Sequence, residues 1–451
     1  MTARSTSNRY ATMTETPVPQ LITRLSVPTI ISMLVTGIYN TADTFFVGRI
    51  STQATAAVGL VFAVMAIIQA LGFFCGHGSG NYLARMLGAG NHREANEMAA
   101  TGFAAALIIG LLVTVLGLLN LDRLSLLIGA TETTIADTRT YMRIILLGAP
   151  FMTCQFVINN QLRFQGAAVY AMIGLMCGAV LNLILDPLLI LVLHMGVAGA
   201  AIATVMGQAA SFFVLLTGST KGENIHLHVR NVRLNAHYLL QLVNGGAPSL
   251  FRQGLASVST LFLNTAAGSL GGDAAIAGMS VVTRVLMLLA SAMIGFGQGY
   301  QPVCSFNYGA NRRERVREGY FFCVKIGTVF LGIVSILCFI FAPQVVAVFR
   351  DDPDVIAVGQ VALRCQTVTL PLLAGTVISN MMLQSIGKGV KASICASSRN
   401  GLFFIPLILI LPRLFGLFGV EVTQAIADVL AFLISIPLAW SELRTMKESA
   451  G

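Results

Sequence analysis

Two aspartates stand inside stretches of the sequence that are otherwise almost entirely apolar. Asp43 ends the run LSVPTIISMLVTGIYNTAD, and Asp186 lies within LNLILDP. A carboxylate is costly inside a membrane, and by default it marks a functional site there. Asn182 lies four residues before Asp186, so a helix would place both side chains on one face. Residues of these types could bind and release a small cation.

The spacing predicts that three helices bring oxygen groups to one depth. Asp186 lies eight residues before His194. Thr204 lies eight residues after Gly196, and Asp43 lies just before a predicted loop on the same side. At about 1.5 Å of rise per residue, all three lie roughly 10 Å below one surface. We therefore expect Asp186 and its neighbours to meet Asp43 inside the bundle.

The chemistry expected of this cluster is cation exchange. Two carboxylates in a dry pocket cannot both stay charged cheaply, so a proton or a bound cation would relieve them. Carboxylate, amide and hydroxyl oxygens suit hard cations, which leaves both H⁺ and Na⁺ open. The alternative is a polar cluster that only stabilises the fold.

The composition identifies the class of protein that must position these residues. Of 451 residues, 55% are hydrophobic and 10% are charged, against about 25% charged in ordinary soluble domains. Apolar runs long enough to cross a bilayer recur throughout. We predict an all-α polytopic membrane protein with twelve spans, at roughly 23–47, 55–80, 97–120, 138–161, 169–193, 197–218, 239–268, 274–302, 319–342, 357–385, 390–411 and 419–440.

The basic residues indicate topology and do not indicate nucleic-acid binding. The net charge of +9 comes largely from short loops that alternate along the chain. Cytoplasmic loops carry such an excess of lysine and arginine. We expect a multi-pass protein of the plasma (inner) membrane with both termini in the cytoplasm. The residues on which this depends are Arg85, Arg93, Arg163, Lys221, Arg230, Arg233, Arg312, Arg313, Arg315, Arg317, Lys388 and Lys391.

The sequence also repeats itself. GHGSGNYLARMLGAGNHRE (76–94) resembles GQGYQPVCSFNYGANRRER (297–315) at an offset of 221 residues. Six spans per half is an even number, so both halves cross the membrane in the same sense, as in parallel-repeat transporters. We predict two homologous six-helix bundles with a parallel pseudo-two-fold axis. The expected segments are a cytoplasmic tail (1–20), a first bundle (21–218), a cytoplasmic linker (219–238), a second bundle (239–441) and a cytoplasmic tail (442–451).

Five motifs in order resemble the multidrug and toxic compound extrusion (MATE) family: NTADTFFVG, RMLGAG, LNLILDP, GVAGAAIAT and NYGAN. The resemblance covers about residues 20 to 440. It implies a monomeric antiporter, coupled to Na⁺ or H⁺, that exports amphipathic and often cationic organic compounds by alternating access. Its partners would be a small-molecule substrate and membrane lipid. The alternatives are a flippase for lipid-linked sugars or an exporter of an endogenous metabolite.

The resemblance also implies roles for individual residues. A helix 1 proline, here Pro28, is implicated in bending that helix, and Tyr141 matches a position that lines the drug cavity. Tyr141 is equally compatible with a tyrosine at the membrane interface. The implied cation-coupling residues are Asp43, Asn182, Asp186 and Thr204, which would be the metal ligands if the ion is Na⁺, together with Tyr39 and Asn159.

The second half of the chain differs from the first in its charges. The predicted helices 7 and 10 contain no acid, and Asn264 stands where the offset would place a counterpart of Asp43. We therefore expect coupling in the first half only, and a structural hydrogen bond for Asp428. Arg284 either faces a central cleft or braces the second bundle, and Met287 is a candidate for the same substrate cavity. The sequence shows no HExxH, no GxSxG and no metal-ligand spacing, so we expect no enzyme activity and no resident cofactor.

Overall fold

The computed structural model describes residues 3–220, 225 and 227–448, and within them the side chains of 9–37, 46–219, 225 and 227–448. The described part is helical and contains no strand. The backbone of residues 38–45 belongs to a helix, but their side chains lie outside the description. Tyr39 and Asp43, both predicted at the cation site, fall in that stretch.

The described helices account for all twelve predicted spans. Ten helices are long and apolar enough to cross a membrane, and the pair α12–α13, bent by 56°, makes one more. The longest, α9, is two helices joined at Gly272, which brings the described spans to twelve. They are α2 (Val18–Val47), α3 (Thr52–Gly88), α4 (His92–Leu119), α6 (Ile135–Phe164), α7 (Ala168–Pro187) with the π-helix η1 (Leu188–Val192), α8 (Gly196–Thr220), α9 (Ala236–Gly309), α10 (Arg313–Ile340), α12 (Pro353–Thr369) with α13 (Leu372–Ser385), α14 (Gly389–Ser397) with the π-helix η3 (Ser398–Phe403) and α15 (Phe404–Phe415), and α16 (Leu417–Glu448).

Helix α9 reverses direction at Gly272. Its φ of 61° and ψ of −152° lie in a region that only glycine adopts readily. We call residues 236–271 the first limb of α9 and residues 273–309 the second limb. Four shorter helices complete the described chain: α1 (Ala3–Glu15), α5 (Leu121–Leu127), η2 (Val229–Asn231) and α11 (Ala342–Phe349).

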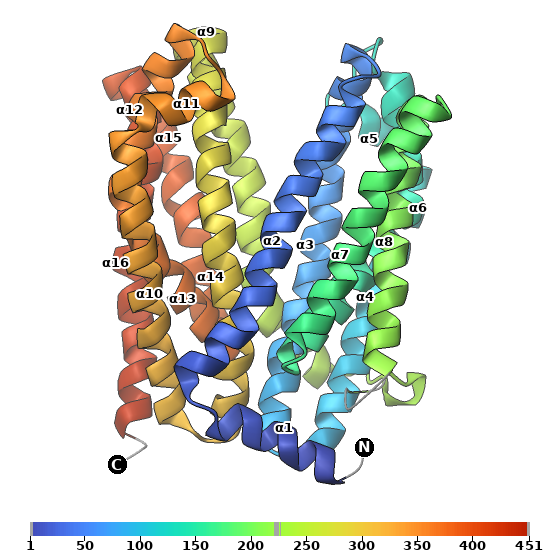
Figure 1. Ribbon diagram of the computed structural model, residues 1–451, viewed down its shortest axis with the longest axis vertical. Helices are drawn as coiled ribbons and strands as arrows, with labels where there is room; N and C mark the ends of the chain where they lie inside the picture. Colours follow the sequence, from blue (N-terminus) through green and yellow to red (C-terminus); the bar gives the residue numbers. More distant parts are fainter. Residues whose placement is uncertain (1–2, 221–224, 226, 449–451) are drawn as a thin grey trace.

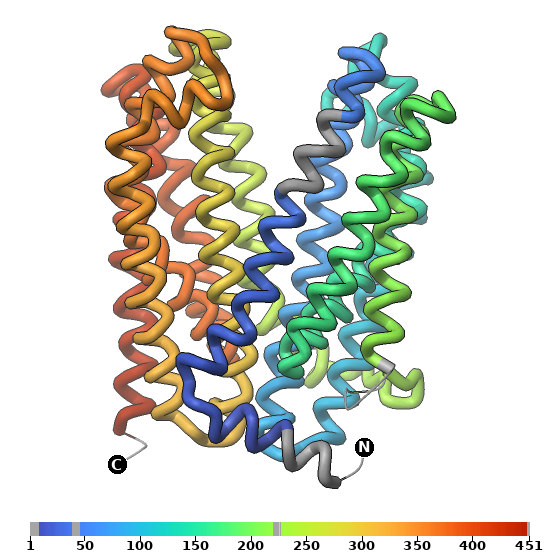
Figure 2. Tube along the Cα trace, viewed as in Figure 1, coloured from blue at the N-terminus to red at the C-terminus, as the bar shows by residue number. Residues whose placement is uncertain are grey.

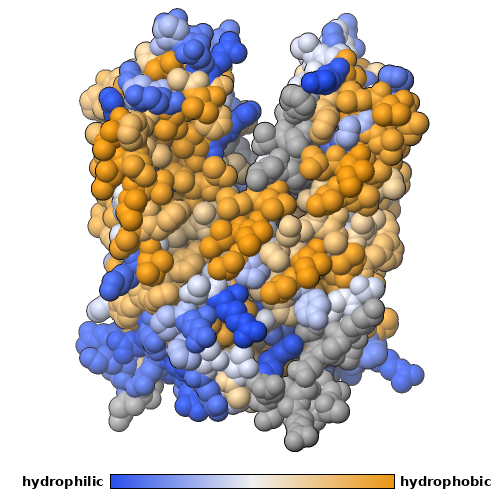
Figure 3. Space-filling model, in the orientation of Figure 1, coloured by the Kyte–Doolittle hydropathy of each residue, from blue (hydrophilic) through white to orange (hydrophobic). Residues whose placement is uncertain are grey.

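The helices form two lobes that stand side by side (Figure 1). The N-terminal lobe contains α2 to α8, and the C-terminal lobe contains α9 to α16. The lobes meet at the end of the molecule where both termini lie, and the tube in Figure 2 shows them diverging toward the other end. We call these the closed end and the open end. The space-filling view shows a deep notch between the lobes at the open end, here called the cleft (Figure 3).

The surface has the pattern of a membrane protein. In Figure 3 an apolar band covers the middle of both lobes, and hydrophilic residues gather at the two ends. Exposed leucine, isoleucine, valine and phenylalanine are numerous on the long helices. In water such a surface would be strongly unfavourable, whereas lipid tails cover it without cost. The prediction of an all-α, multi-pass membrane protein is confirmed.

The repeat predicted from sequence appears as symmetric contacts at the closed end. A Cβ atom added to Gly88 of α3 would lie 2.0 Å from the backbone oxygen of Phe306. A Cβ atom added to Gly309 of α9 would lie 1.9 Å from the backbone oxygen of Arg85. Both pairs are related by the offset of 221 residues. Glycine at these two positions therefore lets the lobes touch backbone to backbone, and we call this pair of crossings the glycine seal.

Helix α1 lies across the closed end (Figure 1). Asn307 of α9 donates to the backbone oxygen of Met13, and Arg315 of α10 donates to the backbone oxygen of Thr16. The predicted N-terminal tail (1–20) thus contains a helix that the polar sequence did not indicate. The side chain of Met13 is buried in the core, so this helix is packed against the bundle.

Candidate functional site

Asn182, Asp186 and Thr204 come together between α7 and α8. With the amide oriented to satisfy both neighbours, Asn182 Nδ2 donates to Asp186 Oδ2 at 3.0 Å. Asn182 Oδ1 then accepts from the backbone nitrogen of Thr204 at 3.2 Å. All three residues are buried, with Asp186 at 0% exposure. The N-terminal lobe therefore holds a carboxylate, an amide and a hydroxyl-bearing residue in one buried cluster.

Small residues allow α7 and α8 to approach closely enough to build this cluster. A Cβ atom added to Gly178 of α7 would lie 2.4 Å from the backbone oxygen of Gly207 of α8. One turn further along, Ser211 donates to the backbone oxygen of Gly174 at 2.7 Å. Close helix crossings through small residues are typical of membrane bundles. This crossing is what brings Asn182 of α7 against the backbone of α8.

The backbone next to Asp186 departs from a regular α-helix. Pro187 has no N–H, so it cannot donate the helical hydrogen bond to the carbonyl of Leu183. The π-helix η1 follows at once, and Leu193 donates to the backbone oxygen of Leu188 at 2.9 Å. Short π-helical segments frequently occur at functional sites. The acid thus stands where the helix offers a carbonyl oxygen as well as side-chain oxygens.

Asn159 does not join the cluster. Its Nδ2 donates to the backbone oxygen of Ala171 at 2.8 Å. The same bond recurs in the C-terminal lobe, where Asn380 donates to the backbone oxygen of Ala392 at 2.6 Å. Both pairs are separated by the 221-residue offset. The described contacts of Asn159 therefore tie α6 to α7 and do not reach Asp186, which differs from the position expected for a coupling residue.

Tyr141 and Pro28 are both buried. Tyr141 has 0% exposure, and its hydroxyl lies 3.9 Å from the sulfur of Met65. In this arrangement of the lobes Tyr141 therefore has no surface in the cleft. Helix α2 runs unbroken through Pro28, and Ser32 donates to the backbone oxygen of Pro28 at 2.8 Å. The predicted bending of helix 1 at this proline stays a prediction.

Arg284 and Met287 are exposed on the second limb of α9. Met287 is 68% exposed. Arg284 is not in any hydrogen bond or ion pair that the structure gives for the described residues, so it does not brace the C-terminal bundle through a polar contact. Of the two roles expected for Arg284, a place in the cleft fits these observations.

Asp428 has a charged partner that the sequence did not predict. Arg399 of η3 lies 2.7 Å from Asp428 Oδ1, and Gln424 donates to the same oxygen at 2.8 Å. The arginine stands at the start of the apolar run SSRNGLFFIPLILI. A charged residue in such a run was the sign in the sequence that a buried acid could have a cationic partner. The C-terminal lobe thus contains an acid with a fixed cation beside it, whereas the amide of Asn182, beside Asp186, is neutral.

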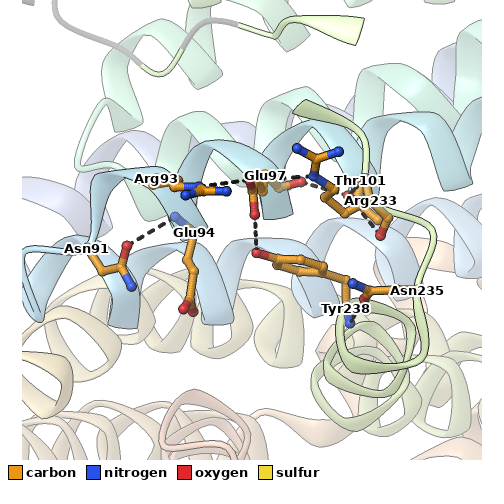
Figure 4. A network of polar contacts seen from close by, with 8 residues as sticks. All are labelled: Asn91, Arg93, Glu94, Glu97, Thr101, Arg233, Asn235 and Tyr238. Carbon is orange, nitrogen blue, oxygen red and sulfur yellow. Dashed lines mark hydrogen bonds and ion pairs between the residues drawn. The ribbon is translucent and has the colours of Figure 1, made fainter. Parts of the chain in front are cut away.

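A polar network joins the lobes near the closed end (Figure 4). Helices α4 and α9 each begin at an asparagine cap, Asn91 and Asn235, which fixes where their first turns lie. Tyr238 of α9 donates to Glu97 of α4 at 2.6 Å. Arg233, just before α9, lies 3.6 Å from Glu97. Glu97, a partly exposed acid of the N-terminal lobe, therefore holds the beginning of the C-terminal lobe.

A second, deeper contact between the lobes centres on Arg163 of α6. Its guanidinium donates to Gln298 of the second limb of α9 and to Asn160, and it lies 3.4 Å from His77 Nε2. Arg163 is 2% exposed. Arg163 was predicted to lie in a cytoplasmic loop, but the structure buries it between the lobes.

Comparisons with known proteins give the family. The MatE family model matches residues 28–188 and again 248–410, one match for each lobe. The multidrug export protein MepA of Staphylococcus haemolyticus is 26% identical over 433 residues, which cover 95% of this chain and 94% of that protein.

Solved structures agree over the whole chain. An outward-facing multidrug resistance MATE family transporter has a TM-score of 0.91 and 27% identity, covering 97% of this chain and 98% of that one. A MOP superfamily transporter from Pyrococcus furiosus has a TM-score of 0.90 and 28% identity, with coverage of 97% and 98%. The two six-helix lobes, their parallel repeat and these matches together show that the chain belongs to the MatE family, whose members are membrane transporters and not enzymes.

Proposed function

We propose that this protein is a cation-coupled antiporter that exports amphipathic, often cationic organic compounds by alternating access. Its relatives include multidrug export proteins, which supports organic compounds as the substrate class. The observation that carries the coupling mechanism is the buried cluster of Asn182, Asp186 and Thr204 in the N-terminal lobe. The coupling ion would be Na⁺ or H⁺.

The burial of Asp186 supports ion exchange at this site. A charged carboxylate taken out of water is strongly unfavourable unless a cation or a proton compensates it. Asp43 and Tyr39 are proposed to complete the site from α2, whose helix packs against α7. If Na⁺ is the ion, the carboxylates, the Asn182 amide and the Thr204 hydroxyl would supply its oxygen ligands. Binding of the ion would remove the free-energy cost of the buried charge, and dissociation of the ion would restore that cost.

The C-terminal lobe is proposed to take no coupling ion. Arg399 already compensates Asp428, at 2.7 Å. A carboxylate with a fixed guanidinium beside it has little affinity for a second cation. This asymmetry supports the expectation that coupling is confined to the N-terminal lobe.

The shape of the molecule supports the alternating-access part of the proposal. With both termini in the cytoplasm, the cleft would open to the outside and the glycine seal would close the cytoplasmic side. Substrate would enter from the cytoplasm only when the seal and the Tyr238–Glu97 contact separate. The present structure would then be the outward-open state, in which substrate leaves.

The test is transport by purified protein in liposomes, with a Na⁺ or an H⁺ gradient imposed one at a time. We expect one of the two gradients to drive substrate movement in the wild type. Asp186→Asn should abolish this response, because the amide keeps the shape but cannot exchange a cation. The matched control is Asp122→Asn, which removes an exposed carboxylate paired with Arg139 at the surface. Gradient-driven transport by Asp186→Asn at the wild-type rate would refute the proposed mechanism.

A further inference from the structure

Arg284 is a charged side chain deep in a membrane span with no polar partner among the described residues. It lies eleven residues into the second limb of α9, counted from Asp273, or about 16 Å from the open end of that helix. This depth is near the middle of a hydrocarbon core about 30 Å thick. An arginine at such depth faces a bundle interior or a water-filled cavity, because lipid cannot solvate it.

The helical register shows which of these surroundings Arg284 has. Gly295 lies eleven residues, or about three turns, further along the same limb. A Cβ atom added to Gly295 would lie 2.8 Å from the Cα atom of Ile30, so this face of the limb touches α2 of the N-terminal lobe. Arg284 points in the same direction from a level where the lobes have separated. It therefore faces the cleft.

Met287 supports the same assignment. It lies eleven residues before Gln298, whose side chain contacts Arg163 of the N-terminal lobe. The face of the second limb that packs on the N-terminal lobe near the closed end is thus the face that carries Arg284 and Met287 nearer the open end. Leu288, beside them, is 50% exposed. The cleft wall of the C-terminal lobe therefore presents one guanidinium among flexible apolar side chains.

The opposite wall at this level is formed by α2, which carries the Tyr39–Asp43 segment. The two helices run antiparallel, and Ile30 stands opposite Gly295. Three turns toward the open end on α2 lead to residue 41, in the Tyr39–Asp43 segment. The backbone of this segment of α2 and Arg284 thus lie at one level on different lobes, so the arginine stands opposite the helix that is proposed to complete the cation site.

We propose that Arg284 determines substrate specificity by binding a carboxylate group of the transported compound. This inference rests on the proposed export function. It assigns recognition of an anionic group on the substrate to a residue of the C-terminal lobe. The guanidinium would form a charge-assisted hydrogen bond with the carboxylate, and Met287 and Leu288 would contact the apolar part.

The test compares two dyes that differ only in this group. Rhodamine 6G is an amphipathic cation with an ethyl ester, and rhodamine 19 is the same cation with the free carboxylate. Dissociation constants would be measured by fluorescence anisotropy on the full-length protein in nanodiscs, and KM and kcat in liposomes. The variants are Arg284→Gln, which removes the charge, and Arg284→Lys, which keeps it. Arg364→Gln is the control, because Arg364 bonds the backbone oxygen of Phe339 within the C-terminal lobe.

In Arg284→Gln we expect the Kd and KM for rhodamine 19 to rise about tenfold, the lower end of the range for losing a hydrogen bond between charged groups. The values for rhodamine 6G should change less than about twofold by the same reasoning, which also shows that the variant is folded. Arg284→Lys should recover most of the rhodamine 19 affinity. Equal losses for both dyes, or no loss for rhodamine 19, would overturn the inference. Failure of the wild type to move either dye under any gradient would instead count against the export function, and the binding data would still decide the role of Arg284.

Discussion

Replacement of Gly309 by alanine should prevent the closed end from closing. The added Cβ atom would lie 1.9 Å from the backbone oxygen of Arg85 and 2.7 Å from its carbonyl carbon. Ordinary contacts begin near 3.4 Å, so α3 and α9 would have to separate by about 1.5 Å at this crossing. Both contacting groups are backbone, so neither can rotate away. The substitution therefore acts on the glycine seal itself.

The size of the expected shift in the conformational equilibrium follows from the free-energy cost of overpacking. Forcing an extra carbon atom into a well-packed contact costs about 1–3 kcal/mol. In the proposed alternating-access cycle the closed end touches only in the present state, so this cost would change the equilibrium between the two states by about 5- to 150-fold. Alanine is otherwise favoured over glycine inside a helix by roughly 1 kcal/mol. A loss of the open-cleft state would therefore not reflect a weakened helix.

The assay is the distance between spin labels across the mouth of the cleft, attached at Thr131→Cys and Asp351→Cys. Both positions are exposed. Thr131 lies between α5 and α6 and Asp351 lies between α11 and α12, and Figure 1 shows α5, α11 and α12 at the open end. The exposed Cys177 would first be replaced by serine. We expect Gly309→Ala to shift the distances toward shorter values, and Gly88→Ala to do the same. Gly254→Ala is the control, because no atom lies within 4 Å of its added Cβ. Wild-type distances together with wild-type transport in Gly309→Ala would refute the role of the seal.

Three further predictions concern single contacts. Tyr238→Phe removes the 2.6 Å bond to Glu97 and should favour the same shift more weakly, by about tenfold or less in the equilibrium, as read by the same labels. Arg399→Leu should destabilise the protein by about 3–5 kcal/mol, because it leaves Asp428 buried without its cation. The melting temperature should recover in the double variant that also carries Asp428→Leu. Equal melting temperatures of the single and the double variant would count against a stabilising ion pair. Asn264→Ala should leave the ion dependence of transport unchanged, and loss of ion-driven transport at normal protein level would contradict coupling in one lobe.

The spans and the repeat could be predicted because they depend on local composition. Apolar length sets the number of membrane helices, and matched motifs at one offset reveal two copies of a bundle. The glycines of the seal were visible in these motifs as Gly88 and Gly309. That each would meet the backbone of the other lobe was not visible, because sequence does not show which helices cross.

The candidate site was predicted in part. The spacing of Asn182 and Asp186 indicated a shared face, and the structure brings both to Thr204. Asn159 was assigned by resemblance alone, and its amide instead bonds a neighbouring helix. The pairing of Asp428 depends on an arginine 29 residues away on another helix. Contacts of that kind depend on helix rotation and crossing, which apolar periodicity does not determine.

The most direct test of the proposed coupling mechanism is cation release by the purified protein when substrate binds. In wild-type protein, addition of rhodamine 6G should displace the coupling ion, seen as released protons with a pH indicator dye or as lost radioactive sodium. Asp186→Asn should bind the dye but release no ion, because its amide holds no exchangeable cation. Ion release by Asp186→Asn equal to that of the wild type would contradict the central claim that the buried cluster of the N-terminal lobe couples cation exchange to export.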